Sequence, residues 1–257
     1  MPISTLFSQG LDSYLAENAD SPNDFWLFQH IPKTAGSALR NQLFKALGSA
    51  SGIDVKNIDP SLPLEKRRAE ATRQFLQRSK KHPYRCAGGH ITMPEVLRIL
   101  HHHPDAKLIT FLRDPVERVI SDYVYFHQQE ATRKSETAQR IFASFESFVN
   151  HIASQNKMFR FLAPDLSISD EDLSGFVERR FVFIGLQDSY APSVELLGRL
   201  VGKKIDADAR IRDSAASGSS KPEVSAADRH AIAAHNARDV YLFEHFRDRL
   251  QPFLKPE

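Results

Sequence analysis

The stretch Phe25-Trp26-Leu27-Phe28-Gln29-His30-Ile31-Pro32-Lys33-Thr34-Ala35-Gly36-Ser37-Ala38-Leu39 joins an apolar run to a loop of small residues. The run over 25–28 has the length and the continuous apolarity of a buried parallel strand. The loop follows at 29–36, and beyond it apolar residues recur at helical spacing until Gly48. This stretch therefore predicts a strand–loop–helix unit.

The same alternation continues along the 257 residues of the chain. We expect further buried strands at 84–87, 106–112 and 181–186, helices at 6–17, 64–80, 94–100, 115–124, 142–152, 170–177 and 225–250, and a loop at 49–63. Strands that alternate with helices favour a three-layer α/β fold with a mostly parallel central sheet flanked by helices. No internal repeat or second-domain boundary is visible. We therefore expect a single domain over 1–257, with an N-terminal extension at 1–24 and a core over about 25–250.

Composition excludes several classes of protein. The net charge of +2 argues against a non-specific binder of polyanions such as nucleic acid. Cys86 is the one cysteine, which excludes a disulfide framework or a cysteine-rich zinc site within one chain. No stretch approaches the roughly 20 apolar residues that span a bilayer, and residues 1–10 lack a secretory signal. We expect a soluble cytoplasmic protein.

Residues 32–38 have the features of an anion site. The start of a helix offers unpaired backbone N–H groups and the positive end of the helix dipole. Small residues let a phosphate approach the backbone, Lys33 adds a cation, and Thr34 and Ser37 add hydroxyl donors. The lysine precedes Gly36, and no magnesium-binding acidic residue follows a strand, so the loop differs from that of nucleotide triphosphatases. An ordinary loop that contains a lysine and a glycine is the alternative.

A second candidate anion site follows the strand expected at 106–112. Arg113 would lie at the carboxyl end of that strand, where ligands of parallel sheets bind, and an arginine can form two hydrogen bonds with one phosphate. Ser121 lies on the helix that follows. In the alternative interpretation, Arg113 pairs with Asp114 or Glu117 as part of a capping network.

These two segments together resemble a known family. Residues 29–39 look like the 5′-phosphosulfate loop of carbohydrate sulfotransferases, with heparan and uronyl 2-O-sulfotransferases and their bacterial relatives as the closest branch. Residues 111–123 are similar to the family's 3′-phosphate motif, Arg-Asp/Asn-Pro-x-x-Arg-x-x-Ser-x-Tyr. The resemblance implies a P-loop-like fold and transfer of a sulfuryl group from 3′-phosphoadenosine 5′-phosphosulfate (PAPS), without a metal, to a hydroxyl group of a saccharide or glycolipid.

The resemblance also implies roles for individual residues. Lys33 would neutralise charge on the leaving 5′-phosphate, and the backbone amides after it would cradle that phosphate. Arg113 and Ser121 would bind the 3′-phosphate, whereas Arg118 would support the structure. Residues 217–221 fall where the family closes a loop over the nucleotide. The expected donor-binding residues are Lys33, Thr34, Ala35, Gly36, Ser37, Ala38, Arg113, Ser121, Ser217 and Lys221.

The transfer also needs a group that takes the proton of the acceptor, and histidine suits this because its pKa lies near neutrality. The segment 87–90 resembles the Gly-His segment of the 2-O-sulfotransferase branch, which implies that His90 is the general base. A His90 that is merely hydrogen-bonded in a turn is the alternative. Residues 156–162 resemble the acceptor-side segment, which implies that Arg160 meets an anionic sugar. His127 is a further candidate for the acceptor pocket.

Other functions stay open. A non-catalytic nucleotide- or sugar-binding protein on the same fold would bind the donor product and transfer nothing. A P-loop kinase is disfavoured by the order of lysine and glycine in the loop. Residues 101–103 are three histidines without acidic or cysteine partners at ligand spacing, so we expect no metal. The missing membrane anchor differs from the Golgi members of the family and points to a bacterial enzyme.

Overall fold

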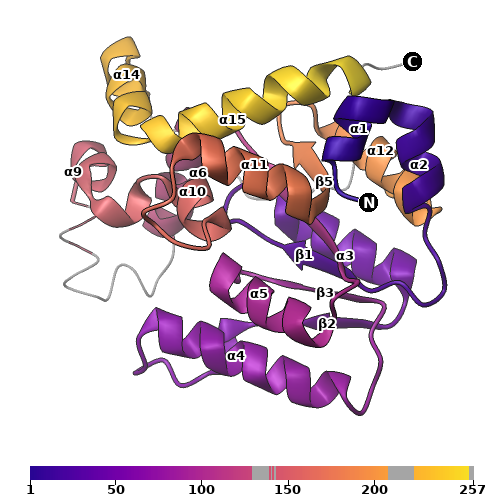
Figure 1. Ribbon diagram of the computed structural model, residues 1–257. Helices are drawn as coiled ribbons and strands as arrows, with labels where there is room; N and C mark the ends of the chain where they lie inside the picture. Colours follow the sequence, from indigo (N-terminus) through magenta and orange to yellow (C-terminus); the bar gives the residue numbers. More distant parts are fainter. Residues whose placement is uncertain (129–138, 140, 142, 208–222, 255–257) are drawn as a thin grey trace.

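The computed structural model describes residues 1–128, 139, 141, 143–207 and 223–254. Within this part of the chain, five strands form one parallel sheet in the order β2-β3-β1-β4-β5 (Figure 1). The strands are β1 (Trp26–Gln29), β2 (Ala50–Gly52), β3 (Cys86–Gly89), β4 (Lys107–Leu112) and β5 (Phe181–Leu186). The parallel sheet predicted from the alternation of strands and helices is confirmed.

Helices connect the strands and cover the sheet. They are α1 (Ser4–Gln9), α2 (Leu11–Asn18), α3 (Gly36–Leu47), α4 (Leu64–Ser79), α5 (Met93–His102), α6 (Pro115–Gln128), α9 (Phe145–Asn150), α10 (Lys157–Leu162), α11 (Asp170–Arg180), α12 (Tyr190–Val201), α14 (Ala226–His235) and α15 (Ala237–Leu250), with the short 3₁₀ turns η1 (Val55–Asn57), η2 (Ile152–Ser154) and η3 (Gln251–Phe253). Helix α3 lies on one face of the sheet and α4 and α5 on the other, which makes three layers (Figure 1), and right-handed crossovers in this strand order give the same arrangement.

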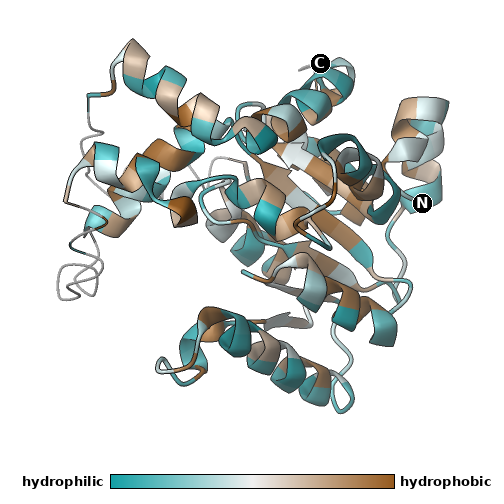
Figure 2. Ribbon diagram, turned by 60° about the vertical axis from the view of Figure 1, so that its left-hand side comes forward, coloured by the Kyte–Doolittle hydropathy of each residue, from teal (hydrophilic) through white to brown (hydrophobic). Residues whose placement is uncertain are grey.

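The core lies along the sheet. Every residue of β1, β3 and β5 is buried, and Figure 2 shows apolar residues concentrated on the central strands. Because helices cover both faces of a parallel sheet, its strands are continuously apolar rather than alternating. This continuous apolarity explains why both ends of the strand predicted at 181–186 agree with β5.

The first residues of the chain pack on β5. Ile3 and Tyr14 are fully buried in the main hydrophobic core. The backbone N–H of Ile3 donates to the carbonyl of Phe181 at 2.7 Å, and the hydroxyl of Tyr14 donates to the carbonyl of Val182. Gly10, with a φ of 85°, divides the single helix expected here into α1 and α2. The N-terminal segment therefore contributes to the same core as the sheet.

Two further expectations differ from the structure. The segment 49–63 was expected to be a loop, but it contains β2 and η1, because its backbone pairs with β3 despite its lack of an apolar run. The helix expected over 225–250 is interrupted at Asn236, whose side chain accepts a hydrogen bond from the backbone of Asn156 at 2.9 Å. An asparagine held by such a contact competes with the helical backbone.

Candidate functional site

The loops after β1, β3 and β4 meet at one edge of the sheet. These three strands are adjacent and parallel, so their carboxyl ends point the same way. This edge is where open α/β sheets bind ligands. It carries both segments singled out in the sequence and His90.

The loop after β1 has the backbone of an anion cradle. Lys33 and Ala35 have φ angles of 69° and 76°, on either side of the fully buried Thr34. The Thr34 hydroxyl donates to the carbonyl of Ile31 at 2.9 Å, which fixes the turn. Alternation between right- and left-handed residues turns successive N–H groups into one concavity that suits an anion, and α3 begins immediately afterwards at Gly36.

Gly36 is required by the imidazole of His30. A Cβ atom at position 36 would lie 2.1 Å from Cδ2 of His30, which is far inside van der Waals contact. The His30 ring is 4% exposed and stacks on Phe28 with 5.4 Å between ring centroids. His30 therefore shapes the candidate phosphate-binding loop at 29–36, called the phosphate loop below, and only glycine fits against its ring.

Arg113 connects the two candidate anion-binding segments. Its Nη1 donates to the carbonyl oxygen of Lys33 at 3.0 Å. Its Nη2 lies 4.0 Å from the carboxylate of Glu117, at the limit of an ion pair. Asp114 caps α6 as expected, accepting a hydrogen bond from the N–H of Glu117 at 2.9 Å. Ser121 is half-buried on the same helix. The sequence separates Lys33 and Arg113 by 80 residues, and the fold puts them in contact.

The side chain of Lys33 lies among charged groups. Its Nζ is 4.3 Å from the centre of the Tyr125 ring. Burial lowers the pKa of Lys33; the charge of Asp122 acts against this, while Arg113 and Lys157 lower the pKa further. An anion placed beside Lys33 would favour its charged form and would itself be stabilised.

The hydrogen bond of His90 selects its tautomer. Its Nδ1 lies 2.7 Å from the carbonyl oxygen of His30. A carbonyl only accepts, so Nδ1 carries the hydrogen and the neutral ring has its lone pair at Nε2. Burial lowers the pKa of His90, although the hydrogen bond to His30 raises it in part. Near neutral pH, His90 is therefore an uncharged imidazole that is able to take a proton at Nε2.

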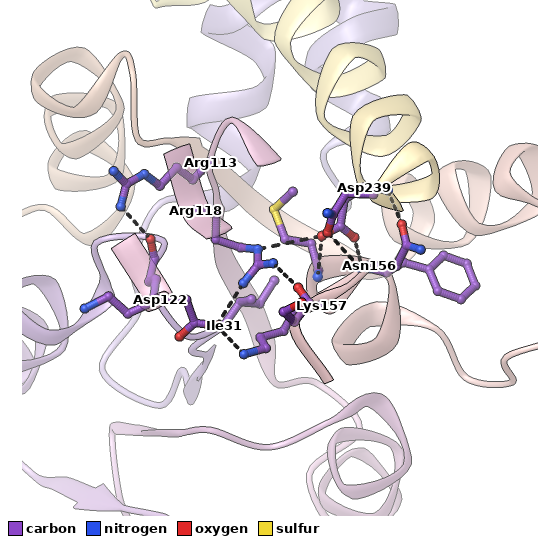
Figure 3. A network of polar contacts seen from close by, with 12 residues as sticks. Ile31, Arg113, Arg118, Asp122, Asn156, Lys157 and Asp239 are labelled. Carbon is purple, nitrogen blue, oxygen red and sulfur yellow. Dashed lines mark hydrogen bonds and ion pairs between the residues drawn. The ribbon is translucent and has the colours of Figure 1, made fainter. Parts of the chain in front are cut away.

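Arg118 is the centre of a buried polar network (Figure 3). It is fully buried, and its Nη2 donates to the carbonyl of Ser154 at 2.7 Å. Its guanidinium pairs with Asp122 at 3.2 Å and with Asp239 at 3.8 Å. Asp239 also accepts hydrogen bonds from the first backbone N–H groups of α10, at 3.1 and 2.7 Å. These contacts fasten α6, α10 and α15 together, as the supporting role predicted for Arg118 requires.

Asp122 and Lys157 were not singled out in the sequence. The Nζ of Lys157 contacts Oδ2 of Asp122, the same oxygen that pairs with Arg118. Both residues lie inside segments that carry the family resemblance. Their opposite charges are the feature of the sequence that could have suggested an ion pair. Their pairing depends on the docking of α10 against α6, which local patterns do not specify.

The two residues expected on the acceptor side, Arg160 and His127, are both exposed. Arg160 is exposed on α10, and its Nη1 donates to the carbonyl of Ile152 at 3.0 Å. His127 is exposed near the end of α6 and stacks on Tyr123 with 5.4 Å between centroids. Ser217 and Lys221 lie outside the described residues.

A cavity of about 660 Å³ opens beside the first turns of α3. It is lined by Ala38, Asn41, Gln42, Lys45, Ala46, Lys203, Lys204 and Asp206. The lining follows α3 from Ala38 to Ala46 and includes none of residues 33–37. Its volume lies in the range of small-molecule sites.

The described residues were also compared with the requirements of a metal site and of a membrane-spanning helix. They contain no cluster of three or more His, Cys, Asp or Glu side chains able to hold a metal ion. None of the helices seen in residues 1–128, 143–207 and 223–254 is both long and apolar enough to span a bilayer.

Solved sulfotransferase structures share low sequence identity with the chain. A sulfotransferase from Alicyclobacillus acidocaldarius is 16% identical, with a TM-score of 0.48 over 92% of this chain and 100% of that one. Mouse sulfotransferase SULT7A1, in complex with PAP, is 14% identical, with a TM-score of 0.39 over 92% of this chain and 81% of that one. No curated protein matches significantly in sequence. The family model of galactose-3-O-sulfotransferases matches residues 8–252, which is nearly the whole chain. The resemblance to carbohydrate sulfotransferases is thereby confirmed, and the chain belongs to the galactose-3-O-sulfotransferase family.

Proposed function

We propose that the protein transfers a sulfuryl group from PAPS to a hydroxyl group of a saccharide. The contact between Arg113 and Lys33 is the observation that carries this proposal. It brings an arginine suited to a 3′-phosphate against the loop suited to a 5′-phosphate. A donor phosphorylated at both positions needs two adjoining anion sites, whereas a nucleoside triphosphate needs one continuous cradle. Membership of the galactose-3-O-sulfotransferase family supports the same reaction.

The donor would lie along the phosphate loop and α3. In this proposal the backbone N–H groups of residues 34–38 and the ammonium of Lys33 hold the 5′ end, and Arg113 and Ser121 hold the 3′-phosphate. The 660 Å³ cavity beside Ala38 would receive the nucleoside. Ser217 and Lys221 are proposed donor contacts on the resemblance alone.

His90 would act as the general base. As the acceptor oxygen forms its bond to sulfur, the bond from sulfur to the 5′-phosphate oxygen breaks and the acceptor proton passes to Nε2 of His90. Lys33 and the loop amides would meet the charge that develops on the leaving phosphate. The reaction balances with one proton released, and these residues supply the charge stabilisation without a metal.

The family is named for galactose, so a terminal galactose of a glycan or glycolipid is the first acceptor to test. Arg160 and His127 are proposed acceptor contacts, because both are exposed and lie on α10 and α6, the two helices joined by the contact between Lys157 and Asp122.

Two measurements test the proposal. Calorimetry with 3′-phosphoadenosine 5′-phosphate (PAP) should show binding by the native chain and weaker binding by Arg113→Ala, and labelled PAPS should deliver label to a saccharide. No PAP binding would disprove the donor. PAP binding without transfer to any saccharide would favour the non-catalytic alternative, and magnesium-dependent ATP hydrolysis would favour a kinase.

A further inference from the structure

The register of the sheet places His30 beside His90. β1 and β3 pair in parallel, and Gln29 with Gly89 is their last aligned pair. The ladder continues one residue further, because the N–H of His30 donates to the carbonyl of Gly89 at 3.1 Å. Residues at matching positions of neighbouring strands project from the same face of a sheet. The two imidazole rings accordingly contact each other, with 4.2 Å between their centroids and 35° between their planes.

The ring of His30 is fixed by its own neighbours. It stacks on Phe28, with 12° between the two ring planes, and a Cβ atom at Gly36 would overlap it. Gly88 lies opposite Phe28 in the sheet, and a Cβ atom there would come within 3.1 Å of Cβ of Phe28. Side chains packed at this density keep one rotamer, so His30 offers His90 a surface of fixed position.

His30 stays uncharged beside His90. Its ring is 4% exposed, and its buried Nδ1 has no hydrogen-bond partner within the described part of the chain. Burial lowers the pKa of His30 well below its ordinary value of 6.5, and the charges of His90, Arg40 and Lys33 lower it further. A proton that reaches this pair of rings is therefore held by His90.

Charged groups also act on His90 from the elements packed around it. After burial and the hydrogen bond to His30, Arg40 of α3 and Arg68 of α4 lower the pKa of His90, whereas Asp54 raises it. Arg40 and Asp54 pair with each other at 2.9 Å, which limits the net effect of either charge. Two contacts orient the His90 ring itself, and both come from His30: the hydrogen bond at Nδ1, with 2.7 Å between nitrogen and oxygen, and the ring face.

We propose that His30 is a positioning residue for the proposed base. Its carbonyl fixes which nitrogen of His90 carries the hydrogen, and its uncharged ring covers one face of the His90 imidazole, so that the lone pair of Nε2 keeps one direction. A ring held by a hydrogen bond alone can turn about that bond, and orientation of the reacting group contributes strongly to rate. When His90 takes the proton, the ring against it is uncharged and does not repel the new charge. This inference rests on the proposed function and goes beyond it, since it gives the side chain at position 30 a part in the transfer step.

Two substitutions test the ring, because both keep the backbone carbonyl of residue 30. His30→Leu removes the flat face, and kcat for transfer from labelled PAPS should fall by about 10- to 100-fold. The KM for PAPS and the affinity for PAP should change far less. His30→Phe restores an uncharged ring and should recover most of the transfer lost in His30→Leu. Melting temperatures and calorimetry with PAP show that each variant is folded.

The matched control removes another histidine ring that packs on a phenylalanine. His103 lies against Phe25, just before the start of β1, with 4.9 Å between ring centroids. This contact is at the opposite end of β1 from His30. His103→Leu should therefore leave kcat unchanged.

A double variant separates positioning from a general effect on the fold. If His30 acts through His90, His30→Leu should lower transfer strongly in the native chain and add little to the loss caused by His90→Ala. An effect of the same size in both backgrounds would show that His30 acts on the fold and would overturn the proposal. Full transfer by folded His30→Leu, or a folded His30→Phe as slow as His30→Leu, would overturn it too.

Nuclear magnetic resonance on the native protein tests the ring pair without turnover. The ring ¹⁵N signals are assigned by their loss in His30→Phe and in His90→Ala. Near neutral pH, His90 should carry its hydrogen on Nδ1, and His30 should stay uncharged while His90 titrates. A His90 with its hydrogen on Nε2, or a His30 that becomes charged before His90, would overturn the proposal. If the native protein transfers no label from PAPS, the proposed function fails, and the resonance result still decides how the two rings are arranged.

Discussion

Lys157 of α10 contacts the carboxylate of Asp122 on α6, at the same oxygen that pairs with the fully buried Arg118 (Figure 3). One carboxylate thus balances two cations and also acts on the pKa of Lys33. The phosphate loop is thereby linked electrostatically to the packing of α6 against α10.

Replacing Asp122 by Asn should destabilise the protein strongly. The variant keeps the shape of the side chain, removes the carboxylate that pairs with Lys157 and leaves the buried Arg118 with Asp239, at 3.8 Å, as its ion-pair partner. Breaking a buried pair in this way costs about 3–5 kcal/mol, which urea unfolding would measure. Asp105→Asn, in an exposed turn, should change the free energy of unfolding by less than about 0.5 kcal/mol. Equal stability of the two variants would contradict the role of Asp122.

Replacing Lys33 by Ala should remove most of the transfer. The ammonium is the side-chain cation of the loop, and loss of one such stabilising group lowers the rate by about 10²- to 10³-fold. Labelled PAPS with a saccharide acceptor measures the rate. The exposed Lys56→Ala in η1 is the matched control and should behave as native. Undiminished transfer by Lys33→Ala would disprove the assignment.

His90→Ala should separate binding from chemistry. PAP affinity measured by calorimetry should persist, while transfer should fall by about 10²- to 10⁴-fold. Because burial lowers the pKa of His90 below its ordinary value of 6.5, the native acid limb of kcat/KM should lie below pH 6.5. His102→Ala, exposed at the end of α5, is the control. An acid limb above pH 6.5 would be inconsistent with His90 as the base.

The buried His30 should make the native state sensitive to acid. Burial lowers the pKa of His30 well below its ordinary value of 6.5, so the unfolded chain binds a proton in a range where the native chain does not. Stability is therefore complete above about pH 6.5 and falls as the pH decreases below it. Urea midpoints at pH 7.5 and 5.5 measure the difference, and a higher midpoint at pH 5.5 would refute it.

Gly36→Ala should disrupt the phosphate loop. The new Cβ would overlap the His30 ring, so either the ring or the start of α3 must move, and PAP binding should be lost. Gly175→Ala is the control, because there the new Cβ meets only the flexible end of Arg179, at 3.1 Å. That helix position should gain roughly 0.5–1 kcal/mol of stability. Tight PAP binding by Gly36→Ala would show that the cradle tolerates the displacement.

The sequence predicted those parts of the molecule that depend on local patterns. Continuous apolar runs identified β4 and β5, Asp114 and Pro115 identified the start of α6, and Gly48 identified the end of α3. Their positions follow from burial and from capping chemistry within a few neighbouring residues.

Other features depend on contacts between distant segments. β2 has no apolar run of its own and exists because β3 offers a free edge. The break at Asn236 reflects a hydrogen bond to a residue 80 positions earlier. These relationships have no signature within a short window of sequence.

The carbonyl of His30 that holds His90 belongs to the peptide from which the phosphate loop departs. His90, the proposed proton acceptor, is therefore held by the loop proposed to bind the donor and not by the helices proposed to hold the sugar. If the loop tightens around a nucleotide, the imidazole follows as part of the same unit. Such a linkage favours an ordered kinetic mechanism in which the nucleotide binds before the sugar. The sugar would then bind next to a His90 that the bound nucleotide has already positioned.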